Sequence, residues 1–200
     1  MTTVTRTHTA TPVDFRRRLL DGMAAAIGEI GYRDTTVADV VRLAKTSRRT
    51  FYEHFASKET CFVALITEAN DEMIRRIAGA VDPTQSWPTQ VRAAVVEWLA
   101  CSDAEQAVTH SWIRDMPALG ALGRQLQRDM LEKFVDMVQA LTDSESLRAI
   151  GIHRVDRQMA ILLLGGLREL IASNVEEGGE ATDITETAVR ASIALLGPRT

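Results

Sequence analysis

The sequence predicts an all-α protein. Apolar residues recur at the three- and four-residue spacing of amphipathic helices along most of the 200-residue chain. The 12 glycines and 5 prolines mostly fall between these periodic segments. No stretch alternates apolar and polar residues strongly enough to indicate a strand. A chain of this length can bury a core without disulfides or metal ions.

Two helices are expected to open the chain. The first begins at Thr11-Pro12, where a capping residue precedes a proline at the first helical position, and it ends at Gly31. The second begins at Thr36, which forms a capping box with Asp39, and it runs for about two turns. Each has one apolar face, so the two are expected to pack together.

A short third helix and a longer fourth helix follow. Ser47 caps the third helix, in which Phe51 and Phe55 are expected to point inward. The fourth helix begins at residues 57–59. Only a tight turn separates the second helix from the third, and this arrangement is typical of a helix-turn-helix.

Five further helices are predicted beyond a loop that Asp82-Pro83 and Trp87-Pro88 bracket. Residues 143–153 are interpreted as a connection, which makes about nine helices in all. The approximate ranges of the five helices are 88–102, 104–115, 117–142, 154–176 and 183–196.

Charge is unevenly distributed along the chain. The net charge is −4, yet residues 1–60 contain ten basic and seven acidic residues. The basic excess therefore lies in the segment with the helix-turn-helix pattern, as expected for a DNA-binding head on an acidic body.

Several classes of protein are not expected. Residues 1–11 lack the apolar segment of a secretory signal, and the longest apolar run, 159–167, is too short to cross a bilayer. Cys61 and Cys101 have neither metal-ligand spacing nor a disulfide framework. Phosphate-binding glycine loops and nucleophile elbows are absent from the sequence. We therefore expect a cytoplasmic protein with no catalytic residues, metal or cofactor.

The third helix carries the side chains best suited to contact DNA. Arginine can donate two hydrogen bonds to guanine, and hydroxyl groups can reach phosphates or bases. Thr36 and Ser47 stand at helix N-termini, where free N–H groups favour phosphate. Two adjacent arginines on a helix more often only face solvent. The DNA-binding interpretation therefore depends on their combination with the helix-turn-helix pattern and the residues around them. Residues 16–18, three arginines in the first helix, would contact phosphates or face solvent.

This segment resembles the N-terminal domain of the TetR (tetracycline-repressor) family. The matching residues are TVADV at 36–40, Ser47, TFYEHF at 50–55 and SKE at 57–59. The resemblance implies a helix-turn-helix domain at 1–60 and a helical effector-binding and dimerisation domain at 61–200. It also implies a homodimer on palindromic operator DNA. The residues predicted to bind DNA are Thr36, Lys45, Ser47, Arg48, Arg49, Thr50, Tyr52, His54 and Lys58.

The turn before the third helix departs from the family pattern. Lys45-Thr46 stands where the family usually has a glycine and an apolar residue. A lysine with positive φ would cost on the order of 1 kcal/mol, and otherwise the turn has a different geometry. A phosphate contact from Lys45 would offset such a cost.

Bulky and soft side chains gather in the middle of the second domain. Methionine and tryptophan can line an adaptable cavity, although each of them alone is more often a core residue. The resemblance implies a small-molecule effector site among them, for which His110 and Arg114 would supply polar anchors. The residues predicted to line the site are Trp98, Cys101, His110, Trp112, Met116, Met130, Phe134 and Met137.

The last two helices are broadly apolar. Residues 159–167 are apolar all round, so both sides of this helix must be covered. Gly165 and Gly166 lower helix propensity, which the close approach of another helix would offset. We expect a four-helix interface between two subunits, as in TetR dimers; burial within one subunit would also explain the pattern. The predicted interface residues are Leu162, Leu163, Gly166, Leu170, Ile184, Ala188, Ala191 and Leu195.

The expected function is that of a repressor that a small hydrophobic or amphipathic effector releases from its operator. One alternative is a redox-responsive regulator that uses Cys61 or Cys101. Another is a DNA-binding protein that responds to no effector. An α-helical enzyme is a further rival, but no catalytic motif supports it.

Overall fold

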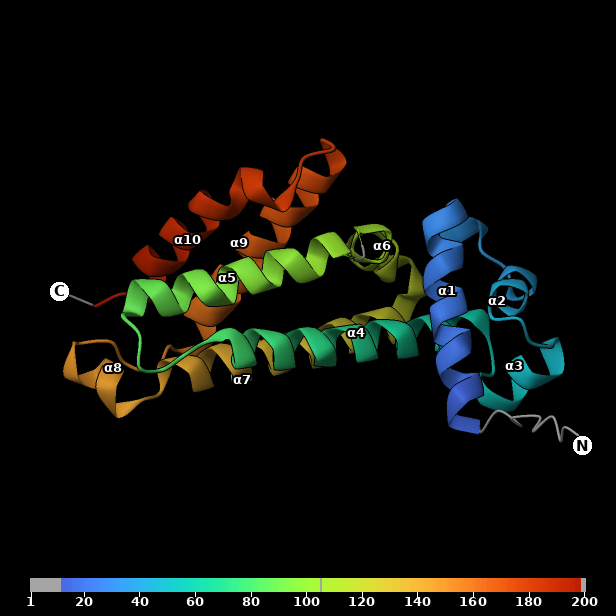
Figure 1. Cartoon of the computed structure of the whole chain (residues 1–200), viewed down its shortest axis with the longest axis horizontal. Helices are drawn as coiled ribbons and strands as arrows, with labels where there is room; N and C mark the ends of the chain where they lie inside the picture. Colours follow the sequence, from blue (N-terminus) through green and yellow to red (C-terminus); the bar gives the residue numbers. More distant parts are fainter. Residues whose placement is uncertain (1–11, 105, 199–200) are drawn as a thin grey trace, which may run out of the picture. The chain divides into compact units, whose positions relative to one another are not determined.

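The computed structural model describes residues 12–104 and 106–198 (Figure 1). These residues form ten α-helices and one short 3-10 helix, with no strand among them, so the all-α prediction is confirmed. The chain divides into two compact units, residues 1–65 and 66–200. Within the described part of the chain, no helix is long and apolar enough to cross a membrane.

The first unit contains three complete helices and the beginning of a fourth. Both α2 and α3 pack against α1, as the apolar faces in the sequence suggest (Figure 1). The helices are α1 (Pro12–Asp34), α2 (Val37–Leu43), α3 (Arg48–His54) and α4 (Lys58–Ala80). Gly31, the predicted end of the first helix, leaves the helical conformation with φ 76°. Thr11, its predicted cap, lies outside the described residues.

Side-chain caps begin α2 and α3 at the predicted positions. Thr36 Oγ1 accepts a hydrogen bond from the Asp39 N–H at 3.4 Å, and the Asp39 carboxylate accepts one from the Thr36 N–H at 3.1 Å. These two bonds complete the capping box. Ser47 Oγ accepts a hydrogen bond from the Thr50 N–H at 3.1 Å. Free N–H groups at both helix starts are thereby satisfied, which fixes where the two short helices begin.

The second unit is a helical bundle. Helix α10 lies against α5 and α9, and α7 lies against α9 (Figure 1). Beyond the end of α4, its helices are α5 (Trp87–Ala104), α6 (Gln106–Arg114), α7 (Gly120–Thr142), α8 (Glu145–Ala149), α9 (Arg157–Glu176) and α10 (Ala181–Leu196). Its core contains mainly aliphatic side chains from α4, α5, α7, α8, α9 and α10, together with the buried Trp87 and Phe134.

Two segments differ from the prediction. Helix α8 lies in the segment that the sequence analysis interprets as a connection. Ser144 caps it by accepting a hydrogen bond from the Leu147 N–H at 3.2 Å, but five residues are too few to show a helical period. The predicted helix at 117–142 is instead a 3-10 helix, Met116–Leu119, followed by α7. The helix type changes at Gly120, the first residue of α7, because its φ of 60° lies outside the helical range.

Candidate nucleic-acid interface and ligand cavity

One face of α3 packs inward and the other is open. Phe51 is fully buried and Phe55 is also buried, as predicted. On the opposite face, the Arg49 side chain is 90% exposed and Tyr52 is 59% exposed, and Arg48 is exposed beside them. A helix that presents two arginines and a tyrosine outward has the donors that read base edges and bind phosphates.

The charges around α3 differ in their partners. Lys45 and Arg48 have no ion-pair partner among the described residues and are exposed. Arg49 Nε lies 3.1 Å from Glu53 Oε1, one turn further along the same helix. Arg42 on α2 is paired with Glu29 at 3.1 Å. Near α3, the basic residues without an ion-pair partner are therefore Lys45 in the turn and Arg48 at the start of α3.

The turn between α2 and α3 adopts the left-handed conformation that the sequence analysis weighed. Lys45 has φ 50° and is the only non-glycine residue with positive φ among those described. The Lys45 N–H donates to the Arg42 carbonyl at 3.2 Å, and the Thr46 N–H donates to the Val41 carbonyl at 2.9 Å. These are the two hydrogen bonds of a Schellman motif, so the usual turn forms here without its glycine.

Arg18 on α1 supports this turn. Its Nη2 donates to the carbonyls of Ala44 at 2.6 Å and Lys45 at 2.5 Å. Its guanidinium also lies 5.4 Å from the centre of the Phe15 ring. Arg18 therefore does more than face solvent, and phosphate contacts by the arginines at 16–18 stay a prediction.

Lys58 lies at the C-terminal end of α1. Its Nζ donates to the carbonyls of Tyr32 at 3.0 Å and Arg33 at 3.3 Å, and it lies 4.4 Å from the centre of the Tyr32 ring. An ammonium group there stabilises the last carbonyls of the helix. A phosphate contact by Lys58, which the resemblance implies, stays a prediction.

The other predicted DNA contacts are more local. The hydroxyls of Thr36 and Ser47 act as helix caps, and Ser47 Oγ also lies 3.0 Å from Thr50 Oγ1. His54 is half-buried, with its ring centre 6.5 Å from that of Phe55. These residues shape the ends of α2 and α3, and their contacts with DNA stay predictions.

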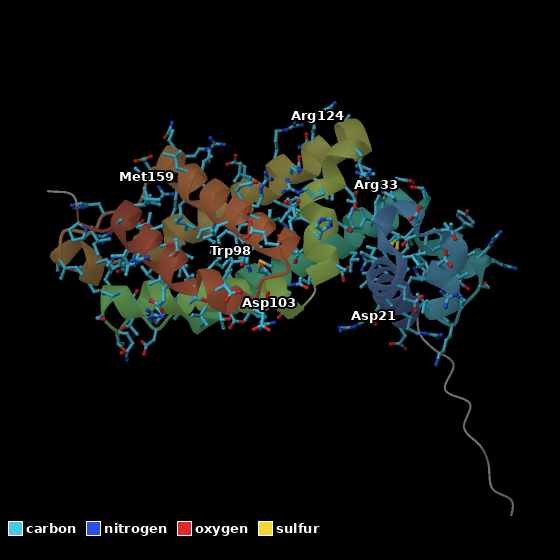
Figure 2. All side chains as sticks on the ribbon, turned by 90° about the horizontal axis from the view of Figure 1, so that it is seen from above. Asp21, Arg33, Trp98, Asp103, Arg124 and Met159 are labelled. Atoms are coloured by element: carbon cyan, nitrogen blue, oxygen red, sulfur yellow. The ribbon has the colours of Figure 1, made fainter. Side chains whose placement is uncertain are left out.

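Part of the predicted effector site is brought together in the second unit. Trp98, labelled in Figure 2, stacks on Phe134 with ring centres 5.5 Å apart. Trp98 and Met137 both border an apolar cavity of about 60 Å³. Its other lining residues come from α4, α5, α7, α9 and α10, apart from Val81 just after α4, and include Trp87, Gln90 and Leu167.

The remaining residues predicted at the effector site lie elsewhere and do not line this cavity. Met116 and Met130 are buried, and Met130 Sδ accepts a hydrogen bond from Asn70 Nδ2 at 3.1 Å. Trp112 is half-buried and His110 is exposed. Trp87 was not predicted at this site because the proline that follows it indicated the edge of a loop. No periodic signal distinguishes cavity-lining positions from ordinary core positions.

Both thiols are poor nucleophiles in this environment. Burial raises the pKa of the Cys61 thiol to about 12. Burial also raises the pKa of Cys101, whose Sγ lies 3.8 Å from Glu97 Oε1. The thiolate is the form that reacts with oxidants, so neither site favours redox chemistry. Among the described residues, no three His, Cys, Asp or Glu side chains are grouped to hold a metal ion.

The residues predicted at the dimer interface fall into two groups. Leu163, Ile184 and Ala188 are buried in the core of the second unit. The others are exposed or half-buried: Leu162, Gly166, Leu170, Ala191 and Leu195. A Cβ added to Gly165 or Gly166 would meet nothing within 4 Å, so this face of α9 is open within the subunit.

Comparison with known proteins agrees with this architecture. Residues 19–65 match the family model described as bacterial regulatory proteins, tetR family. Comparison with curated proteins gave no significant match.

Solved structures with low sequence identity share the fold. The fatty acid degradation regulator FadR from Bacillus halodurans is 15% identical, with a TM-score of 0.78 over 92% of this chain and 96% of that one. FadR from Bacillus subtilis, solved in complex with stearoyl-CoA, is 13% identical, with a TM-score of 0.76 over 92% and 99%. A tetR-family regulatory protein from Rhodococcus RHA1 is 15% identical, with a TM-score of 0.65 over 94% and 98%.

The helix-turn-helix, its exposed arginines and the surrounding helices thus agree with the family match. Residues 19–65 of the N-terminal unit match the DNA-binding domain of the tetR family of bacterial regulatory proteins, and the chain has the fold of solved regulators of that family.

Proposed function

We propose that this chain is a transcriptional repressor that acts in the cytoplasm as a homodimer and that a small hydrophobic or amphipathic effector releases from its operator. The observation that carries the proposal is the exposed face of α3. Arg48, Arg49 and Tyr52 point away from a core that Phe51 and Phe55 anchor. Helix α3 would enter the major groove, and Lys45, Ser47, Thr50 and Lys58 would contact the phosphates flanking it.

A dimer follows from how little DNA one subunit can read. Helix α3 has seven residues, so one subunit contacts few base pairs, whereas two subunits read both halves of a palindrome. Leu162 is 64% exposed and lies on the same face of α9 as the open glycine positions 165 and 166. Exposed apolar side chains beside glycines suit the close packing of α9 and α10 against the same helices of a second subunit.

Effector control is supported by the second unit and by relatives. The B. subtilis relative was solved with stearoyl-CoA, so its fold accommodates an acyl ligand. The second unit of this chain contains an apolar cavity. An effector releases DNA only if it binds the non-operator conformation better than the operator-bound one. Release therefore requires differential affinity, not merely binding.

The test begins with DNA fragments that the full-length protein selects from its own genome. Fluorescence anisotropy should show tight binding to a palindromic fragment, one dimer per site, and a steep fall in affinity with salt. Stearoyl-CoA and other acyl-CoAs are then titrated into the complex. Equal affinity for selected and scrambled DNA would reject the proposal, and binding that no ligand relieves would favour an effector-independent DNA-binding protein.

The redox alternative has a separate test. The raised pKa values of Cys61 and Cys101 predict slow reaction with peroxide at neutral pH. DNA binding should be equally resistant to hydrogen peroxide in the wild type and in the Cys61→Ser and Cys101→Ser variants. Loss of binding that either substitution prevents would establish redox control instead.

A further inference from the structure

None of the described residues that line the cavity in the second unit is charged. Most of its lining residues are aliphatic or aromatic, and the polar ones are Gln90, Thr142 and Ser192. An anionic group placed here would lose its hydration without a cation to replace it, which is strongly unfavourable. The cavity therefore selects against carboxylates and phosphates at this position.

Most polar groups at the cavity are already satisfied within the protein. Thr142 Oγ1 donates to the Val138 carbonyl at 2.9 Å, and Ser192 Oγ donates to the Ala188 carbonyl at 2.7 Å. Gln90 Nε2 donates to the Gln85 carbonyl at 2.8 Å. These donors are not available to an occupant of the cavity.

Trp87 is the exception. Its side chain borders the cavity, the residue is only 8% exposed, and its buried indole Nε1 has no acceptor among the described residues. A buried N–H without an acceptor is costly, so natural structures rarely leave one unsatisfied. An acceptor inside the cavity would remove that cost.

We propose that this cavity binds an uncharged, largely apolar small molecule with one hydrogen-bond-accepting oxygen, which accepts from Trp87 Nε1. Ketones, esters and lactones have this chemistry. The apolar part would contact Trp98, Met137 and Leu167, and the oxygen would lie at the Trp87 end. The effector role of such a ligand rests on the proposed function, whereas its binding does not.

The volume limits the size of the occupant. At about 10–15 Å³ for each water-sized group, a cavity of about 60 Å³ accepts on the order of five such groups. A short-chain ketone fits this limit, and so does the end of a longer molecule. Butanone and 2-pentanone are therefore suitable probes.

The decisive measurement is made on the full-length protein without DNA. Trp87, Trp98 and Trp112 give three indole N–H resonances in a ¹⁵N–¹H spectrum, and the one missing from Trp87→Phe identifies Trp87. We expect 2-pentanone to shift that resonance downfield by accepting its hydrogen bond. We expect n-pentane, which has no acceptor, to cause no comparable downfield shift, and we expect pentanoate to bind at least tenfold more weakly than 2-pentanone.

Two variants complete the test. Trp87→Phe keeps the ring but removes the donor, so it should weaken 2-pentanone binding three- to tenfold and leave n-pentane binding unchanged. Ala94→Leu fills the cavity and should abolish binding of both, whereas Val96→Leu, at an exposed position outside the cavity, should not.

The proposal is overturned if the Trp87 resonance does not respond to 2-pentanone, as it would if a buried water satisfied it permanently. It is also overturned if pentanoate binds as tightly as 2-pentanone, or if Ala94→Leu still binds the ketone with unchanged affinity. Operator binding is measured in parallel. Ketone binding without operator release would reject the effector role alone, and loss of operator binding would reject the proposed function alone.

Discussion

Nη2 of Arg18 donates a hydrogen bond to the backbone carbonyl of Lys45 over 2.5 Å. The bond joins the middle of α1 to the turn of the helix-turn-helix, at a residue held in a left-handed conformation. The same nitrogen also donates to the Ala44 carbonyl at 2.6 Å. A charged donor in contact with two turn carbonyls offsets part of the strain of a lysine with positive φ.

The Lys45→Gly variant tests two properties of Lys45 by different measurements: the strain of its left-handed backbone and its contact with DNA. Glycine adopts φ 50° without a Cβ clash, so Lys45→Gly should raise the free energy of unfolding by about 0.5–1 kcal/mol. If Lys45 contacts a phosphate, the same variant should bind operator more weakly and with a shallower dependence on salt. Chemical unfolding and anisotropy titrations at several salt concentrations measure the two effects. Lower stability would contradict the strain argument, and an unchanged salt slope would remove Lys45 from the phosphate contacts.

Two glycines of α1 provide a matched pair for testing the packing of the first unit. A Cβ on Gly22 would lie 2.7 Å from the Val40 carbonyl oxygen and 2.9 Å from the Ala44 nitrogen, both backbone atoms. Gly22→Ala should therefore force α1 and α2 apart and lower the free energy of unfolding by about 1–3 kcal/mol.

Gly28→Ala is the control for this substitution. Gly28 lies on the same helix, and a Cβ there would meet nothing within 4 Å. This variant should stabilise the protein by about 0.5–1 kcal/mol through helix propensity. Thermal unfolding followed by circular dichroism compares the two variants, and equal effects of the two substitutions would contradict the close contact at Gly22.

The capping box of α2 predicts a dependence of stability on pH. The hydrogen bonds that Asp39 accepts from Thr36 hold the pKa of its carboxyl below the ordinary value. The ionised carboxylate therefore contributes stability that is present above the pKa of the unfolded chain, about 4, and is lost as pH falls through the lower folded pKa. Asp39→Asn should be less stable than the wild type at pH 7, and the difference should disappear in acid. Urea unfolding at pH 7, 5 and 3 measures it; a difference that persists at low pH would assign the loss to something other than the charge.

Local signals made the first unit predictable from sequence. Thr36 and Ser47 predicted the starts of α2 and α3 correctly because helix capping depends only on residues within one turn. Phe51 and Phe55 indicated the buried face of α3 because buried positions in a helix recur with the helical period. The left-handed conformation of Lys45 was one of two alternatives, and the departure from the family pattern in the turn, not the helical period, raised it.

Properties that depend on tertiary contacts were not predictable in this way. Lys58 contacts carbonyls 25 and 26 residues earlier in the chain, and no local pattern reports such a contact. Leu163 carries the same apolar signal as Leu162, yet it is buried in the core while Leu162 is exposed. Residues of five helices line the cavity, so its lining depends on how side chains from distant parts of the sequence pack together, which no periodicity records.

The proposed dimer interface on the exposed face of α9 predicts that a charged residue introduced there prevents dimerisation. Leu162 is 64% exposed, so a charge there costs little within one subunit but would be buried in the proposed dimer. Leu162→Glu should shift the protein from dimer to monomer in sedimentation velocity and weaken operator binding, with little change in helix content. Leu122→Glu, at an exposed leucine of α7, is the control and should remain dimeric. A dimeric Leu162→Glu variant would place the interface elsewhere.

Arg49 is the most direct test of sequence reading. Its side chain is 90% exposed on α3, and its ion pair with Glu53 is solvent-exposed and therefore weak enough to exchange for a contact with DNA. Arg49→Ala should lower affinity for the matched operator by about 1–3 kcal/mol, the value of a good contact between arginine and guanine. It should also lose discrimination against one substituted base pair in each half-site. Loss of a contact with phosphate alone would instead weaken binding equally for all DNA sequences.

Arg124→Ala, at an exposed position of α7, is the control and should leave both the affinity and the discrimination unchanged. Anisotropy titrations of matched and singly substituted operators distinguish the outcomes, and unchanged affinity with unchanged discrimination would remove Arg49 from the interface.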